Sequence, residues 1–161
     1  MILVLPDAVS KPIDAKSGTW AEYPETVLKF AIDPEIAVDL RVPLRPPTRN
    51  ALRSLGLNGK FAVLTAYNPR GENIDEEQNR NRMTQLEAEL RSAGDKFVTV
   101  DACSPDESHC ECSVAIMTTR ERAIAIAERF EQVAIFWFDG DHFWIVGVLT
   151  PAAPIRLPLA E

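Results

Sequence analysis

The stretch FAVLTAYNPRG, residues 61–71, decides how the fold of this chain is interpreted. Residues 61–67 are all apolar, β-branched or aromatic, which is typical of a buried strand. The NPRG that follows predicts a turn, because Asn tolerates turn geometry, Pro fixes φ and Gly accepts positive φ. Asp75 with Gln78 three residues later then forms a capping box, so a helix should begin there.

The same alternation of elements continues along the chain. We expect strands at 97–100, 112–117 and 133–138, and a helix opened by the capping box of Thr118 and Glu121. From residue 61 to 138 the order is therefore strand, helix, strand, strand, helix, strand, which is the ferredoxin-like pattern. We predict an α+β fold with a ferredoxin-like βαββαβ core, an antiparallel sheet in the order 4-1-3-2 and both helices on one face.

The flanking segments should extend this core. We expect an N-terminal hairpin from residues 26–32 and 36–42, a short helix at 48–55 and a C-terminal strand at 142–149. The whole of 1–161 is predicted to be a single domain, because its length is close to the usual size of one. Within it we expect a loosely ordered arm at 1–22, the core at 61–138 and an extended Pro-rich tail, outside the core, at 150–161.

Two of the predicted strands are apolar on both faces. Residues 61–67 and 133–138 each place apolar side chains at odd and at even positions. Strands of this kind are normally covered on both sides. The face without helices should therefore be covered either by the N-terminal hairpin and arm or by a second subunit in a homodimer, and the sequence leaves both open.

The charge balance excludes two classes of partner. The chain has 17 Lys and Arg against 24 Asp and Glu, a net charge of −7 and a pI near 4.9. We therefore expect no nucleic-acid partner and no membrane partner, because both would need a basic surface. No signal peptide is recognised, and the longest apolar run falls far short of the ~20 residues that span a bilayer. We expect a cytoplasmic protein.

Polar residues gather at one end of the predicted sheet. In the ferredoxin-like topology the end of the first strand, the start of the first helix and the starts of the third and fourth strands share that end. The candidate ligand-binding residues are Asn68, Arg70, Asn79, Arg82, Glu111, Ser113 and Gln132. Guanidinium groups beside a helix N-terminus favour an anion. Structural roles remain the alternative: a turn for Asn68, an ion pair of Glu111 with Arg82, and a helix cap for Gln132.

Cysteine and histidine side chains cluster between residues 103 and 112, but we expect no metal there and no cofactor. Cys103, His109, Cys110 and Cys112 are zinc-ligand types. The usual zinc knuckle has two residues between paired cysteines, whereas Cys110 and Cys112 are separated by one. Free thiols are expected in a reducing cytosol, and a Cys103–Cys110 disulfide could form during handling.

The polar positions also carry a family resemblance. The motifs are TAYNPRG at 65–71, Asn79-x-x-Arg82 with Leu86, Glu111-x-Ser113 and Phe130-x-Gln132-x-Ala134. Over about residues 60–138 they resemble the bacterial domain-of-unknown-function family 3293. The resemblance implies that the polar motif positions of the family fall on Asn68, Pro69, Gly71, Asn79, Arg82, Glu111, Ser113 and Gln132. It implies no substrate, and the long N-terminal region and the cysteines around Glu111 depart from the family pattern.

Three functions follow as hypotheses. The first is a small soluble module that binds a small polar or anionic ligand, with Arg82 and the helix N-terminus meeting an anion and with Glu111 and Gln132 reading hydroxyl or amide groups. The second is a hydrolase-type enzyme that uses Glu111 as general acid or base. The third is a protein–protein interaction or dimerisation module without a small-molecule site.

Overall fold

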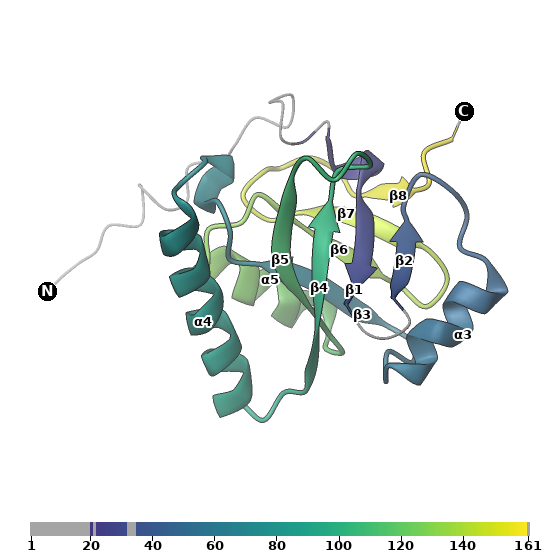
Figure 1. The fold of residues 1–161 in the computed structure, drawn as a ribbon, viewed down its shortest axis with the longest axis horizontal. Helices are drawn as coiled ribbons and strands as arrows, with labels where there is room; N and C mark the ends of the chain where they lie inside the picture. Colours follow the sequence, from purple (N-terminus) through teal and green to yellow (C-terminus); the bar gives the residue numbers. More distant parts are fainter. Residues whose placement is uncertain (1–19, 21, 32–34, 161) are drawn as a thin grey trace, which may run out of the picture.

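One antiparallel sheet organises the molecule. A computed structural model describes residues 20, 22–31 and 35–160. Its elements are η1 (Tyr23–Glu25), β1 (Val27–Phe30), β2 (Ile36–Asp39), α3 (Pro46–Ser54), β3 (Phe61–Thr65), η2 (Pro69–Gly71), α4 (Glu76–Ser92), β4 (Phe97–Cys103), β5 (Cys110–Ile116), α5 (Arg120–Arg129), β6 (Ala134–Phe138), β7 (Phe143–Gly147) and β8 (Ile155–Leu157) (Figure 1). The sheet has eight strands in the order β2-β1-β4-β5-β3-β6-β7-β8.

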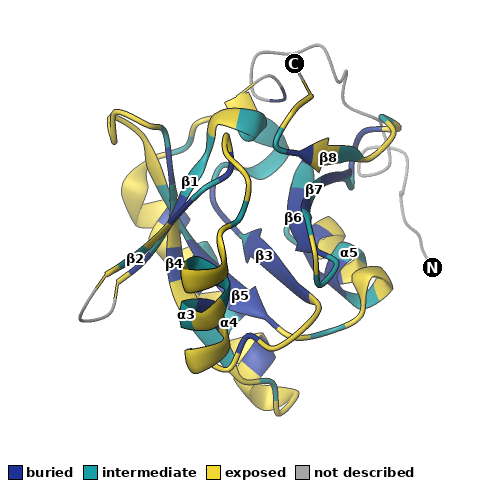
Figure 2. Ribbon diagram, turned by 90° about the vertical axis from the view of Figure 1, so that its right-hand side faces the viewer, coloured by how far each residue is buried: buried dark blue, intermediate teal, exposed yellow. Residues whose placement is uncertain are grey.

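The sheet curls into a half-barrel. Figure 2 shows β1, β2 and β4 on one side and β6, β7 and β8 on the other, with β3 and β5 between them. β1 joins the two-stranded N-terminal hairpin to β4, and β7 and β8 continue the sheet beyond β6. Every pairing is antiparallel, and the strands form one continuous hydrogen-bonded sheet. The twist between neighbouring strands accumulates across this sheet and curves it.

The prediction of a ferredoxin-like core is therefore wrong. The strands between residues 61 and 138 are neighbours in the order β4-β5-β3-β6, which is the order we expected among them. They do not form a separate small sheet, because β1 and β2 extend it at one edge and β7 and β8 at the other. The added strands belong to the same sheet and contribute side chains to the hydrophobic core, so they are not peripheral additions to a separate ferredoxin-like core.

The alternation along β3 explains why the sheet needs apolar cover on both faces. Phe61 and Val63 point into the half-barrel, whereas Ala62 and Leu64 point toward the helices. On the helix side, α4 and α5 pack against the sheet through buried side chains. These are Met83, Leu86 and Leu90 of α4 and Ala123, Ile126 and Ala127 of α5.

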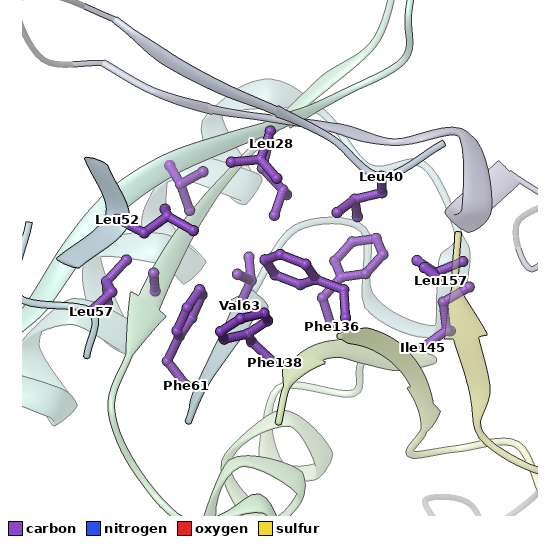
Figure 3. Close-up of a cluster of buried hydrophobic side chains, with 14 of the residues drawn as sticks. Leu28, Leu40, Leu52, Leu57, Phe61, Val63, Phe136, Phe138, Ile145 and Leu157 are labelled. Atoms are coloured by element: carbon purple, nitrogen blue, oxygen red, sulfur yellow. The ribbon is translucent and has the colours of Figure 1, made fainter. Parts of the chain in front are cut away.

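The inner face of the half-barrel is covered by the sheet itself. In Figure 3, Leu28 and Leu40 from the hairpin region lie across from Phe136 and Phe138 of β6, with Val63 of β3 between them. The hairpin is thus the cover that the apolar inner face required. Of the arm predicted at 1–22, residues 1–19 and 21 lie outside the described residues.

Helix α3 closes one end of the half-barrel. Its Leu52, and Leu57 just beyond it, are buried against the start of β3 at Phe61. Phe61, Phe138 and Phe143 form a cluster with ring centroids 4.8–5.7 Å apart. This end of the half-barrel, which we call the closed end, is filled by apolar side chains.

The helix caps are set by local sequence. Asp75 caps α4 and accepts a hydrogen bond from the Gln78 amide at 2.8 Å, as expected. The cap of α5 is Thr119, which accepts from the Arg122 amide at 3.1 Å, so the prediction that placed it at Thr118 is one residue early.

The C-terminal tail differs from its expected place outside the core. Its residues 155–157 form β8, which pairs with β7, and Leu157 is buried inside the half-barrel. In the part of the chain that the structure describes, no helix combines the length and the apolar character needed to cross a membrane.

Candidate functional site

A cavity of about 800 Å³ lies at the end of the half-barrel opposite α3. Its lining comes from η1, the end of β3, the β4–β5 hairpin and the start of β6. We call this end of the half-barrel the open end. It is also the end at which the sequence analysis placed its polar cluster.

Strand β5 supplies one wall of the cavity. Glu111 and Ser113 alternate along it, and His109 lies directly before its first residue at the same spacing, so all three turn into the half-barrel. One carboxylate oxygen of Glu111, Oε2, lies 3.1 Å from Nε2 of His109 and accepts a hydrogen bond from Nδ2 of Asn68 at 3.1 Å. The Ser113 hydroxyl donates to the backbone carbonyl of Glu111 at 3.1 Å. The Glu111 carboxylate is therefore held between the side chains of Asn68 and His109.

Asn68 owes its position to a reciprocal pair of amides. It adopts the left-handed conformation with φ 47° shortly after β3, which ends at Thr65. Its backbone N–H donates to Oδ1 of Asn79 at 2.8 Å, and Nδ2 of Asn79 donates back to Oδ1 of Asn68 at 3.0 Å. Asn79 is 3% exposed and lies in the first turns of α4. It thus positions Asn68 from behind without lining the cavity.

Gln132 is held in one orientation at the start of β6. It is 6% exposed, and its Nε2 donates to the carbonyls of Tyr67 and Phe130, both at 3.0 Å. Both contacts are carbonyl acceptors, so the amide nitrogen must be on that side and Oε1 on the other. Gln132 is one of the residues that line the cavity.

The two arginines of the predicted site do not line the cavity. Arg82 donates from Nε to the Ala66 carbonyl at 2.7 Å and from Nη2 to the Phe130 carbonyl. It ties the end of β3 to the end of α5. The Arg70 amide donates to the Glu131 carbonyl at 2.6 Å, which links the same two regions through the backbone.

The predicted residues thus separate into two sets. Asn68, Glu111, Ser113 and Gln132 line the cavity, whereas Asn79, Arg70 and Arg82 support the backbone around it. The expected ion pair between Glu111 and Arg82 is absent among the described contacts, because the guanidinium serves backbone carbonyls instead.

His109 and Tyr23 are lining residues that the sequence analysis did not include. Alternation from Glu111 could have found His109, had the predicted strand begun before residue 112. Nothing in the local sequence indicates Tyr23, which enters from the N-terminal η1 and packs edge-to-face on Phe136 with ring centroids 5.9 Å apart.

The cavity is electrostatically negative in its lining. Its carboxylates are Glu22, Glu25, Asp106 and Glu111, and Arg41 is the only Lys or Arg among the described residues that line it. Burial, followed by the negative charges of Glu111 and Glu22, raises the pKa of the Tyr23 phenol. The tyrosine is therefore a neutral hydroxyl that can donate or accept a hydrogen bond.

The cysteines of this region form one disulfide. Cys103 of β4 and Cys110 of β5 are directly opposite each other and are bonded, closing a loop whose last residue is His109. Cys112 is a free thiol, and burial, followed by the charge of Asp101, raises its pKa. Within the described residues, no group of His, Cys, Asp or Glu side chains is arranged to hold a metal ion.

Comparison with known proteins gives one family. Residues 64–135 match the family described as "Protein of unknown function (DUF3293)". No curated protein and no solved structure matches the chain. The matched segment runs from β3 to the start of β6, so it contains the open-end residues Asn68, His109, Glu111, Ser113 and Gln132.

Proposed function

Residues 64–135 match the DUF3293 family of proteins of unknown function, and from this premise we propose that the chain binds a small polar molecule in the cavity at the open end. The observation that carries the proposal is the cavity itself. At about 800 Å³ it has the size of a small-molecule site, and polar side chains from separate elements converge on an apolar floor.

The division of labour among the lining residues supports binding. Val63 and Phe136 supply the apolar floor, and the Glu111 carboxylate, the Gln132 amide and the Ser113 hydroxyl supply hydrogen-bonding groups. The supporting hydrogen bonds of Asn68 and Gln132 fix these groups before a ligand arrives, which lowers the cost of ordering them on binding.

A second candidate function is hydrolysis, and the contact between His109 and Glu111 favours it. When the carboxylate is ionised, Nε2 of His109 must carry the proton in their 3.1 Å hydrogen bond. Nδ1 is then the basic nitrogen, and His109 would take a proton from a water bound in the cavity while Glu111 orients the ring. In this enzyme Glu111 assists the base, whereas the sequence analysis gave Glu111 the role itself.

The third hypothesis, a protein–protein interaction module, was based on an apolar sheet face that needed a cover. The inner sheet face that called for a second subunit is covered by the hairpin. Homodimerisation and the cytoplasmic location stay predictions.

The test is a ligand screen on the full chain. A panel of small polar molecules, comprising amines, amides, diols, carboxylates and nucleotides, is added to the protein, and melting temperature and amide chemical shifts are measured. We expect at least one class to raise the melting temperature and to shift resonances of Ser113 and Gln132. Glu111→Gln should weaken that binding at least tenfold, because it removes a charged acceptor from the cavity.

The control variant is Glu128→Gln, which removes an exposed carboxylate from α5 outside the cavity lining. It should bind the hit as the wild type does. The proposal is overturned if no class binds, or if the two variants bind equally well. Should a hit be turned over, His109→Ala should lower kcat with little change in KM, which would separate the enzyme from the binding module.

A further inference from the structure

We infer that the molecule bound at the open end carries a cationic hydrogen-bond donor, as a primary ammonium does. This inference rests on the proposed function and narrows its ligand class. It opposes the anion that the sequence analysis favoured from Arg70 and Arg82, neither of which lines the cavity.

The first observation is an unfilled acceptor on Gln132. Both hydrogens of its amide nitrogen are used by the carbonyls of Tyr67 and Phe130. Its Oε1 accepts no hydrogen bond from the described residues, although the side chain is 6% exposed and lines the cavity. Among the described residues this oxygen is not one of the fully buried, unpartnered side-chain atoms, so it is open to the cavity, and a ligand that donates at this point takes the place of water.

Glu111 provides a second unfilled acceptor, and this one is charged. Asn68 and His109 both contact its Oε2, and Oε1 has no partner in the described part of the chain. The side chain is 26% exposed, so water screens it only in part. Ammonium hydrogen bonds to a carboxylate in such a site are shorter and stronger than neutral ones.

The surrounding charges reinforce a preference for a cation. Glu22, Glu25 and Asp106 also line the cavity, and they add negative potential. The guanidinium of Arg41 is already engaged, since Nε and Nη2 donate to the Asp39 carboxylate at 2.9 and 2.8 Å. A bound anion would therefore be repelled by these carboxylates, and the guanidinium of Arg41, which could attract it, is already paired with Asp39.

The floor of the cavity suits the rest of such a molecule. Tyr23 and Phe136 pack edge-to-face there, and Val63 lies beside them. An aromatic face attracts a cation within about 6 Å of its centroid, and apolar surface accepts a hydrocarbon stem. Burial, followed by the negative charges of Glu111 and Glu22, raises the pKa of Tyr23, so the phenol at this floor stays neutral.

Matched probes of equal shape test the inference. Benzylamine, benzyl alcohol and benzoate, and the series butylamine, butanol and butyrate, are titrated into the full chain at pH 7 and followed by amide chemical shifts. We expect the amine of at least one series to bind at least tenfold more tightly than its alcohol and its carboxylate. Glu111→Gln should reduce that preference at least fivefold, and Glu128→Gln should leave it unchanged. Raising the ionic strength should weaken the amine alone.

The outcomes distinguish this inference from the proposed function. Equal or tighter binding of an alcohol or a carboxylate overturns the cation and leaves the binding site standing. The inference is also overturned if no amine binds while another class of the wider panel does. When neither these probes nor the wider panel bind, the proposed function fails and the inference fails with it.

Discussion

The two ends of the half-barrel are built from the same strands and have opposite chemistry. β3 starts at the closed end with Phe61, which is fully buried among aromatic rings, and ends at Thr65 near the open end, from which the chain continues to Asn68. β6 runs the other way, from Gln132 and Ala134 at the open end to Phe138 at the closed end. Within a few residues, each strand passes from tightly packed apolar side chains to polar side chains around a cavity.

This difference indicates that the closed end mainly stabilises the fold, whereas the open end holds the candidate binding site. Apolar burial stabilises in proportion to the area removed from water, so the closed end should contribute most of the stability of the half-barrel core. The open end leaves a cavity, lined in part by polar side chains, where a fold optimised for stability alone would pack apolar ones. Substitutions at the two ends should therefore have different consequences.

The largest effect is expected at the closed end. Phe61→Ala removes a fully buried ring and should lower the free energy of unfolding by about 3–5 kcal/mol. For a chain of this length the melting temperature should fall by about 10 °C. Chemical denaturation and thermal melting measure both quantities.

The matched control is Val42→Ala, which shortens an apolar side chain that is 52% exposed and should change stability by less than about 0.5 kcal/mol. Should Phe61→Ala not fold, Phe61→Leu keeps the comparison measurable. A loss below about 1 kcal/mol for Phe61→Ala would show that the closed end does not dominate stability.

A smaller effect is expected from the backbone anchor behind the open end. Arg82→Met removes the donor to the Ala66 carbonyl, whereas the Phe130 carbonyl keeps the Gln132 amide as a partner. Leaving one part-buried carbonyl without its charged donor should cost about 2 kcal/mol in urea denaturation.

The control for Arg82 lies on the same helix. Arg80→Met removes an exposed i,i+4 ion pair with Glu76 and should cost only about 0.3–0.5 kcal/mol. Equal losses for Arg82→Met and Arg80→Met would contradict the anchoring role, because they would mean that the guanidinium of Arg82 contributes no more than a surface charge.

The smallest effect is a difference in acid titration between the two ends. Near the closed end, hydrogen bonds and the charge of Arg122 hold the pKa of Asp95 below its usual value. At the open end, hydrogen bonds from Ser108 and Ser104 lower the pKa of Asp106 to about 2. Each carboxylate therefore stabilises the fold above its unfolded pKa, near 3.8, and loses that contribution as the pH falls through its lower folded pKa.

Carboxyl chemical shifts between pH 5 and pH 1.5 measure both midpoints. We expect Arg122→Gln to raise the midpoint of Asp95, because the substitution removes the positive charge beside it. We expect 1 M salt to raise it as well, because the partly exposed guanidinium of Arg122 is screened. The midpoint of Asp106 should stay near 2 in both cases, since its donors are neutral. A salt-dependent Asp106 would contradict this assignment of causes.

Local signals in the sequence predict local structure well. The capping box at Asp75 and the apolar spacing after it predict α4 because both depend on residues a few positions apart. The half-barrel could not be predicted in this way. It depends on β1 pairing with β4, which joins Val27 to Cys103 over a long stretch of intervening sequence. No local pattern encodes that contact.

The candidate site was predictable only to the level of strand ends. Strand adjacency brings Asn68, Glu111 and Gln132 to one end of the sheet, as the sequence analysis expected. The direction of a long side chain is a different matter. Arg82 could reach the cavity or the backbone behind it, and the two carbonyls that decide the outcome are visible only once β3 and α5 are packed together.

Among the strands that the structure describes, the sheet of the half-barrel does not close, so β2 and β8 are its edge strands. A strand at an edge presents backbone groups that can template pairing with another chain and so promote aggregation. β8 is three residues long, and Pro154 and Pro158, which have no amide hydrogen to donate, lie directly on either side of it. The proline-rich tail thus shortens the exposed ladder at that edge and protects the molecule against edge-to-edge association.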